Sequence, residues 1–585
     1  MGAVLSSIQG TLLVGVLVAG LYALYRAALP KPLAGIPYNR DAAGKLFGDV
    51  GEMMGYVMRT KRVFCWLTSL TTRHQSPIIQ AFVKPMGLPW VVVTDPFESQ
   101  DILLRRTKEF DRSGFFGDLI GGILPEQHIQ FVSSDSRFKN NRNLINHLMA
   151  PSFITEISGP QLYKAASTMI KLWELKCGTA EGRPFHAHHD ITYMALDTIF
   201  AGMFGHPEAE SITTNRLEVV SRWEAKREKK LPASLDEPVE FPEPELPAIF
   251  AAALTLANSV TDTQLSPAPR LTSWVLRQLP YMKKATALKD KYIRDRVDES
   301  VRVMEQDGSA PARTALHSVL LRERDVAAKE GRKADFRKRA IADEFFGFML
   351  AGHDTSATTV AWGVKYLADN PAAQDRLRAA LRAALPEATR AKRAPTYQEL
   401  ARAQIPYLDA VVEEVLRHAN TIAFVVRRAM QDTTVLGRHI PKDTDVFLVA
   451  NGAGYLEPNM PLAEEVRSPG AQRSKKTALT GTWDNKDIGA FKPERWLKQQ
   501  AAGEGEGEGG ETFDPMAGPT LPFGLGPRGC FGKRFALQGL KIQFALIVWH
   551  FQLHKTTEAL NSYDAVQRFA QEPTQCYVRL SNANI

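Results

Sequence analysis

The segment Phe523–Gly532, Phe-Gly-Leu-Gly-Pro-Arg-Gly-Cys-Phe-Gly, places one thiol, Cys530, in a glycine-rich loop. Glycine lets the backbone turn sharply and approach a large flat partner closely. Arg528 adds a permanent cation two residues before the sulfur, and the apolar run Lys533–His550 predicts a helix just after the loop. A cysteine at a helix N-terminus near cations favours its thiolate form. We therefore expect Cys530 to be a nucleophile or a metal ligand; a glycine-rich turn with an incidental cysteine is the alternative.

A second group with chemical potential is the run Ala-Gly-His-Asp-Thr at 351–355, in the middle of a helix predicted over Asp335–Asn370. Glycine and threonine so close together are poor helix formers. Gly352 leaves room against a flat ligand, and the Thr355 hydroxyl can bond back to a carbonyl and open the helical hydrogen-bond ladder. Asp354 adds a titratable acid beside that hydroxyl, which indicates a proton-delivery device. A glycine tolerated in a long helix is the alternative.

These two motifs resemble those of the cytochrome P450 family, the haem-thiolate monooxygenases. The loop matches Phe-x-x-Gly-x-Arg-x-Cys-x-Gly at every fixed position, and the 351–355 run precedes it in the order that the family requires. The resemblance implies a mainly α fold with a small β region, with haem b between the long central helix and the cysteine loop. The implied roles are Cys530 as axial iron ligand, Phe523, Gly532 and Gly352 as haem contacts, and Asp354 and Thr355 as the groups that deliver protons to dioxygen.

The same resemblance implies that arginines contact the haem propionates. Arg142 lies in Phe138-x-x-x-Arg142, where the family has Trp-x-x-x-Arg, so the arginine is kept and the indole N–H is lost. A solvated helix face is the alternative for Arg142. Arg428 begins a segment that runs to an Ile-Pro turn, as in the family's strand, and the adjacent Arg427 is its alternative. Arg528 of the cysteine loop is a third candidate.

A group of charged residues is expected to support the cysteine side of the site. Glu414 and Arg417 stand at i, i+3 in the helix predicted over Tyr407–Ala419, so they share one face. Phe-Lys-Pro-Glu-Arg-Trp at 491–496 resembles the family element whose arginine, here Arg495, joins them in a buried triad. We expect this triad to be a structural brace, because a buried charge group tolerates no missing partner. A surface ion pair is the alternative for Glu414 and Arg417.

Other segments position these motifs. The β-branched runs within Ser76–Asp95 predict a hairpin. The apolar, glycine-rich stretch Asp111–Gln130 predicts either a mobile lid over an apolar substrate or a buried loop. Residues 224–247 are charged and then proline-rich, which predicts a surface insertion. Pro458–Gly489 and Gln499–Glu511 are polar or of low complexity and are expected to be exposed insertions without a chemical role.

Composition narrows the function classes. The 585 residues carry a net charge of +8, and their acids and bases are interspersed. Such a mildly basic surface suits anionic lipid or an acidic redox partner, and we find no nucleic-acid motif. The 4 cysteines are scattered without pairing or zinc spacing, which predicts neither a disulfide framework nor a zinc site and fits a reducing compartment.

The N-terminus is expected to be a membrane anchor. Met1–Tyr25 has no charged side chain, and its apolar part is long enough to span roughly 30 Å of hydrocarbon as a helix. Arg26 and Lys31 follow it, so the C-terminal side should face the cytosol. The predicted organisation is an anchor over 1–27, a proline-rich linker over 28–44 and a catalytic domain over 45–585, on a single-pass protein of the endoplasmic reticulum membrane. A cleaved signal peptide is the alternative.

The resemblance implies a monooxygenase that hydroxylates or epoxidises an apolar small molecule with dioxygen. The chain has no flavin or NADPH fingerprint, so electrons should come from a membrane-bound NADPH–cytochrome reductase, with cytochrome b5 as a second candidate donor; Lys533 and Arg534 are docking candidates. The insertions resemble those of filamentous-fungal members that tailor terpenoids or polyketides. The alternatives are a haem-thiolate isomerase or dehydratase that uses no dioxygen, and a haem-binding sensor without enzymatic activity.

Overall fold

The computed structural model describes residues 16–226, 231–266, 268–307, 312–499 and 510–583. The chain forms two compact units. The smaller unit contains the N-terminal part up to Ser113 together with Phe424–Thr477, and the larger contains Gly114–Ala423 together with Ala478–Ile585. The larger unit is mainly helical and the smaller one carries the largest of the described sheets, which agrees with the expected mainly α fold with a small β region.

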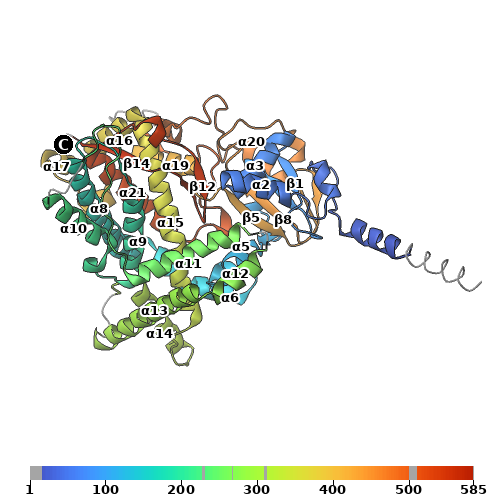
Figure 1. Ribbon diagram of the computed structural model, residues 1–585, viewed down its shortest axis with the longest axis horizontal. Coiled ribbons are helices and arrows are strands. Elements are labelled where there is room, and N and C mark those ends of the chain that lie inside the picture. The colour runs from blue at the N-terminus through green and yellow to red at the C-terminus, as the bar shows by residue number, and fades with distance from the viewer. Residues whose placement is uncertain (1–15, 227–230, 267, 308–311, 500–509, 584–585) are drawn as a thin grey trace, which may run out of the picture. The chain divides into compact units, whose positions relative to one another are not determined.

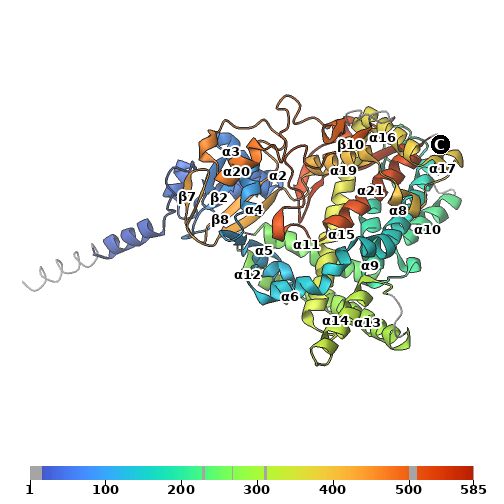
Figure 2. The same ribbon diagram turned by 180° about the vertical axis from the view of Figure 1, so that it is seen from behind.

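A five-stranded sheet forms the centre of the smaller unit. In spatial order its strands are β1 (Ile78–Ala81), β2 (Trp90–Val93), β8 (Asp445–Val449), β5 (Phe424–Ala429) and β3 (Phe110–Arg112). The predicted hairpin is confirmed, because β1 and β2 pair antiparallel with Ile78 opposite Val93. β8 lies parallel to β2 although it is far away in the sequence, as Figure 2 shows, and all its side chains are buried. The rest of this unit comprises α2 (Val50–Thr60), α3 (Val63–His74), α4 (Pro96–Leu104), α20 (Pro469–Lys476), β6 (Thr433–Val435) and β7 (Arg438–Ile440).

The larger unit is built from helices with three small sheets at its periphery. Its helices are α5 (Phe115–Ile120), α6 (Ser136–Ile145), α7 (Pro151–Phe153), α8 (Gly159–Ala180), α9 (His188–Phe204), α10 (Ile212–Ala225), α11 (Ala248–Gln264), α12 (Pro269–Gln278), α13 (Pro280–Asp307), α14 (Ala315–Lys329), α15 (Arg339–Asp369), α16 (Pro371–Ala384), α17 (Pro386–Arg390), α18 (Tyr397–Arg402), α19 (Pro406–Ala419) and α21 (Lys533–His550). Its strands are β4 (Phe185–His186), β9 (Leu497–Gln499), β10 (Glu511–Phe513), β11 (Phe551–His554), β12 (Ala565–Gln567), β13 (Gln571–Pro573) and β14 (Tyr577–Asn582).

The central helix of the larger unit is α15, which packs against α9, α19 and α21 (Figure 1). It ends at Asp369, and Pro371 starts α16, because proline cannot supply the N–H that would continue the helix. Most of its side chains are buried, including Phe345 and Val360, as expected of a helix that is apolar on several faces. The helix predicted over Asp335–Asn370 is confirmed, and the helices predicted over 407–419 and 533–550 are confirmed as α19 and α21.

Two segments differ from their predicted character. Residues 111–130 contain the end of β3, the short helix α5 and a following turn. Apolar side chains of this segment, among them Ile120 and Leu124, are buried, so the buried-loop alternative describes it better than a lid. The proline-rich segment after α10 is held by the fold: Val239 is buried and donates its N–H to the carbonyl of Pro184 at 2.8 Å. Tertiary partners therefore override a composition that favours disorder; residues 227–230 lie outside the described residues.

The insertion over 458–489 also has structural contacts. In the smaller unit Arg467 is buried and forms an ion pair with Asp95 at 2.7 Å. In the larger unit Trp483 and Ile488 are buried beside Trp496. These contacts correct the expectation of a wholly exposed insertion. The low-complexity stretch lies at 500–509, outside the described residues, and the strands β9 and β10 pair on either side of it.

The anchor predicted over 1–27 falls partly outside the described residues, which begin at 16. Residues 16–28 are helical, and they expose large apolar side chains such as Leu17, Leu21 and Leu24. No helix in the part of the chain that the structure describes is both long and apolar enough to cross a membrane. The anchor, the linker over 28–44 and the catalytic domain over 45–585 stay predictions.

Candidate functional site

The cysteine loop has a fixed backbone geometry. Gly524 and Gly526 have φ angles of +59° and +70°, in the left-handed region that glycine adopts without strain. The N–H of Cys530 donates to the carbonyl of Phe523 at 2.6 Å and closes the loop, and α21 begins at Lys533 directly after it. The glycines are therefore needed for the turn that presents the thiol at the N-terminus of α21.

Two opposing effects act on the Cys530 thiol. The backbone N–H groups of Gly532 and Lys533 donate toward the sulfur, and the cations of Lys533 and Arg142 also favour the thiolate. The side chain has accessible surface, yet the protein atoms around it withdraw it from water, and this burial raises the pKa of the thiol above its ordinary value. In the protein alone burial wins, which corrects the expectation that the loop by itself favours the thiolate. A bound metal cation reverses that balance, because a coordinating thiol is deprotonated outright.

The donor set suits a haem iron. Within the described ranges no group of three or more His, Cys, Asp and Glu side chains is placed to hold a metal ion. A haem iron would need a single ligand from the protein, and Cys530 with its N–H donors would provide it as a thiolate. Phe523 accepts the backbone N–H of Cys530, and Gly532 donates its N–H toward the sulfur; their contact with haem stays a prediction.

Arg142 and Arg528 both hold the cysteine loop in place. Arg142 donates to the carbonyl of Pro527 at 2.8 Å, and Arg528 donates to the carbonyl of Phe131 at 2.9 Å. The guanidinium of Arg528 lies 4.0 Å from the ring centre of Phe138, and that of Arg142 lies 5.7 Å from the same ring. The phenylalanine that replaces the expected tryptophan thus contacts both cations. Their contact with haem propionates stays a prediction.

Arg428 has another partner in the smaller unit. Its guanidinium forms an ion pair with Asp445 of the neighbouring strand at 3.1 Å, and Lys84 also pairs with that carboxylate at 2.5 Å. Arg427 is buried, and because side chains alternate along a strand it points to the opposite face of β5. Arg428 thus has a carboxylate partner in its own unit, and whether it or Arg427 contacts a haem propionate stays a prediction.

In residues 351–355 the predicted hydrogen bond of the Thr355 hydroxyl is present, but the predicted opening of the helix is not. The Thr355 hydroxyl donates to the carbonyl of Ala351 at 2.7 Å, while α15 continues through this turn without interruption. A methyl group at Gly352 would lie 2.8 Å from Cδ1 of Ile199, so glycine permits the close approach of α9. Gly352 also borders a small cavity, about 10 Å³, together with Phe535 of α21. Its contact with a flat cofactor stays a prediction.

Asp354 lies in a protected environment on α15. Its Oδ2 accepts the N–H of Ala570, from the turn between β12 and β13, at 3.1 Å. Burial raises the pKa of the Asp354 carboxyl, and the neighbouring His353 and Arg568 only partly oppose that effect. A carboxyl whose pKa is raised can hold a proton and release it, which suits the predicted role.

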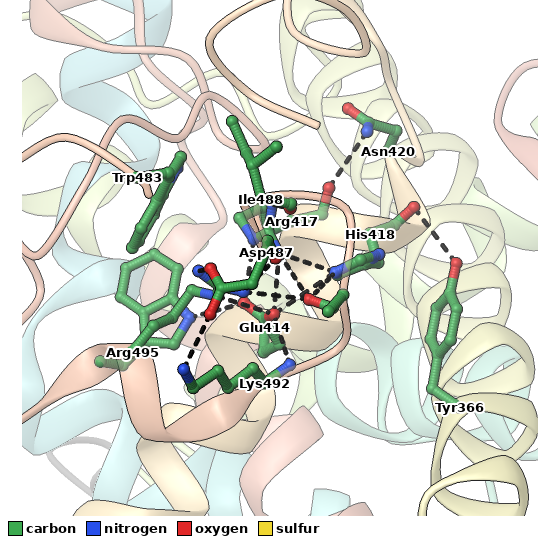
Figure 3. A network of polar contacts seen from close by, with 12 residues as sticks. Tyr366, Glu414, Arg417, His418, Asn420, Trp483, Asp487, Ile488, Lys492 and Arg495 are labelled. Carbon is green, nitrogen blue, oxygen red and sulfur yellow. Dashed lines mark hydrogen bonds and ion pairs between the residues drawn. The ribbon is translucent and has the colours of Figure 1, made fainter. Parts of the chain in front are cut away.

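The predicted triad is confirmed, and Figure 3 shows it as the centre of a larger network. Glu414 binds Arg417 at 2.8 Å and Arg495 at 3.2 Å, and it also accepts from the indole of Trp496 at 2.9 Å. These partners hold the pKa of Glu414 well below its usual range despite its burial. Both carboxylate oxygens of Glu414 accept hydrogen bonds, so the group stabilises the fold and has no proton to exchange near neutral pH.

Sequence reasoning missed three contributors to these sites. Trp483 lies 5.4 Å from the guanidinium of Arg495, and Asp487 binds that arginine at 3.1 Å; both come from the insertion over 458–489. The third is Glu572, a buried acid of β13 whose pKa is raised by burial and by the charge of Asp354. No local pattern marks these residues, because their partners are distant in the sequence.

Comparisons with known proteins agree with the geometry. The cytochrome P450 family profile matches residues 68–457 and 489–579, and the gap in that match coincides with the insertion predicted over 458–489. The cytochrome P450 monooxygenase TRI13 of Fusarium sporotrichioides is 36% identical over 97% of this chain and 98% of its own length. The cytochrome P450 monooxygenase xilC of Penicillium crustosum is 32% identical over 97% of this chain and 95% of its own.

Among solved structures, the crystal structure of the cytochrome P450DA heme domain superposes with a TM-score of 0.64. The match covers 95% of this chain and 99% of that one at 17% sequence identity, so it bears on the fold alone. The long helix, the cysteine loop and the brace thus occur in a fold that has been solved for a haem-binding domain.

Proposed function

Because the chain belongs to the cytochrome P450 family and is a cytochrome P450 monooxygenase, we propose that it hydroxylates or epoxidises an apolar small molecule with dioxygen. The observation that carries this proposal is Cys530, held at the N-terminus of α21 by a glycine turn, with two N–H groups aimed at its sulfur. Haem bound through that thiolate supplies the oxygen-activating chemistry.

Residues of the chain position the cofactor and supply protons to the reaction. Arg142 and Arg528 hold the loop and are candidates for the propionates, with Arg428 or Arg427 as a third. On α15, Thr355 and Asp354 hold and pass protons, Asp354 as a half-buried acid of raised pKa. The brace around Glu414 keeps the cysteine side rigid.

Electrons come, in this proposal, from an NADPH–cytochrome reductase, with cytochrome b5 as a second donor. Lys533 is exposed beside the cysteine loop and suits an acidic docking surface. Arg534 is also exposed, but it donates to the carbonyl of Met149 at 3.0 Å and serves the fold as well. A Lys533→Glu variant should slow reduction by the reductase and leave reduction by dithionite unchanged.

The proposed location is the endoplasmic reticulum membrane, with the anchor over residues 1–27 and the catalytic domain in the cytosol. The exposed apolar side chains of residues 16–28 support a lipid contact at this end of the chain. Leu271 and Trp274 of α12 are also exposed, at 60% and 63%. The substrate class is an apolar secondary metabolite, such as a terpenoid or a polyketide; the similarity to monooxygenases of Fusarium and Penicillium supports a fungal pathway.

The test is a reconstitution of the full chain in membranes with a reductase and a panel of apolar terpenoids and polyketides. The proposal expects NADPH-dependent products that contain one oxygen atom from labelled dioxygen. Product formation without NADPH and without label would contradict it in favour of an isomerase or dehydratase. Haem binding without any product or NADPH consumption would favour a sensor.

A further inference from the structure

A second acid, more deeply buried than Asp354, lies on the hairpin formed by β12 and β13. Glu572 stands opposite Val566 in this hairpin and is only 4% exposed. Its Oε1 forms an ion pair with Nε of Arg568 at 2.6 Å, and its Oε2 lies 3.6 Å from Nε2 of His188. Glu572 is therefore buried with one firm cationic partner and one imidazole nearby.

The hairpin is attached to the central helix just before this acid. The N–H of Ala570 donates to Asp354 at 3.1 Å, and the indole of Trp362 donates to the carbonyl of Gln571 at 2.9 Å. The N–H of Gln571 also donates to the carbonyl of Thr421 at 2.8 Å. These contacts tie the turn that precedes Glu572 to the part of α15 that carries Asp354.

The group also extends toward solvent. The side chain of Arg568 is 51% exposed and that of His188 is 23% exposed, whereas that of Glu572 is 6% exposed. His188 is the first residue of α9, and Arg568 lies in the turn between β12 and β13. Arg568 and His188 therefore link the buried Glu572 to solvent, whereas Asp354 and Thr355 are half-buried on α15, against which β13 packs.

We propose that Glu572 is a proton-relay residue that passes protons from the solvent side, at His188 and Arg568, to Asp354. In each transfer the O–H bond of the Glu572 carboxyl breaks, a bridging water molecule takes that proton and gives up one of its own, and an O–H bond forms on the Asp354 carboxylate. Glu572 then regains a proton from water at the His188 side, so no charge accumulates. The 3.6 Å separation from His188 exceeds a direct hydrogen bond, so this step uses a water molecule or a small side-chain movement. This proposal rests on the proposed function, because only a reaction with dioxygen needs the protons that the relay delivers.

Electrostatics supports the assignment. Burial and the nearby Asp354 raise the pKa of Glu572 to about 7, because Arg568 is a single and half-exposed counter-charge for two acids. Burial and the neighbouring His186, His189 and Arg568 lower the pKa of His188 to about 4, so this imidazole is neutral near pH 7. A carboxyl that titrates near the working pH both donates and regains protons readily.

The first test reads titration without turnover. Infrared difference spectra of the ferric full-length protein are recorded through the pH range around 7 for wild type, Glu572→Gln, Glu572→Asp and the exposed control Glu558→Gln. The relay expects a protonated carboxyl band that disappears as pH rises through about 7 in wild type and the control, and that is missing in Glu572→Gln. An unchanged band in Glu572→Gln would overturn the assignment.

The second test reads proton supply during turnover. The relay expects Glu572→Gln to release several-fold more hydrogen peroxide per NADPH and to show a larger solvent isotope effect, with Glu572→Asp recovering most of the coupling at a shifted pH. Equal peroxide yield, isotope effect and pH profile in all variants would overturn the relay. A wild type that binds haem but consumes no NADPH would instead refute the proposed function, while the infrared result would still judge the titration.

Discussion

Two acidic clusters of the larger unit use the same residue types with opposite results. Glu414 lies between Arg417 and Arg495 and also receives an indole N–H, so the pKa of its carboxyl is held well below its ordinary value. Glu572 is equally buried but shares one half-exposed arginine with Asp354, so its pKa is raised to about 7. Burial alone therefore does not decide the role of an acid. The number of paired cations does: a saturated carboxylate is a brace, and an undersaturated one can carry protons.

The largest expected effect comes from breaking the brace. Glu414→Gln leaves the buried cations of Arg417 and Arg495 without their carboxylate, which should cost roughly 3–5 kcal/mol of stability. We expect a strong loss of haem-loaded protein and a lower thermal midpoint, measured by haem content and calorimetry. Glu387→Gln, at an exposed position on α17, should change neither. A stable, fully loaded Glu414→Gln protein would remove the distinction between the two clusters.

The pH dependence of stability should separate the clusters next. The pKa of Glu572 is raised from 4.5 to about 7, so the folded protein keeps a proton that the unfolded chain releases between these values. This contribution is full below about pH 4.5 and is lost as pH rises to about 7, a change of about 3 kcal/mol. Glu572→Gln removes that loss, so its thermal midpoint relative to wild type should rise with pH across this window. A parallel course of the two curves would contradict the raised pKa.

A smaller effect is expected at the close contact between α15 and α9. Gly352→Ala places a methyl group 2.8 Å from Cδ1 of Ile199, and the resulting overpacking should cost about 1–3 kcal/mol. The double variant Gly352→Ala/Ile199→Val should recover part of the lost thermal midpoint, because it shortens the side chain in the way. If the double variant is no more stable than Gly352→Ala, helix packing is not the reason for the glycine.

The smallest effect is expected at the outer edge of the brace. Asp487 binds Arg495 at 3.1 Å, but its side chain is 30% exposed, so Asp487→Asn should cost only about 1 kcal/mol. Urea denaturation at low and high salt measures this cost, which should shrink at high salt because an exposed ion pair is screened. A loss as large as that of Glu414→Gln would mean that the insertion, rather than the triad, holds the cysteine side.

The sequence alone predicts those elements that depend on neighbouring residues in the chain. The glycines around Cys530 mark a turn, the apolar run after Gly532 marks α21, and Glu414 with Arg417 mark one helix face. The pKa of Cys530 was misjudged because burial depends on tertiary packing, which the loop sequence does not contain.

The remaining differences have the same physical origin. Arg428 is bound by Asp445 from a strand that pairs only after folding, and Val239 is buried by a segment that precedes it by many residues. Glu572 acquires its raised pKa from Asp354, on a helix far away in the sequence. Long-range contacts therefore decide which charged residue is neutralised, and composition cannot reveal them.

The central claim is that Cys530 ligates a haem iron as a thiolate, and the reduced, carbon-monoxide-bound absorption spectrum tests it most directly. Wild type should show the red-shifted Soret band of a thiolate-ligated haem, and Cys530→Ser should lose that band. A wild-type protein that binds haem without the red-shifted band, or a Cys530→Ser protein that keeps it, would contradict the account.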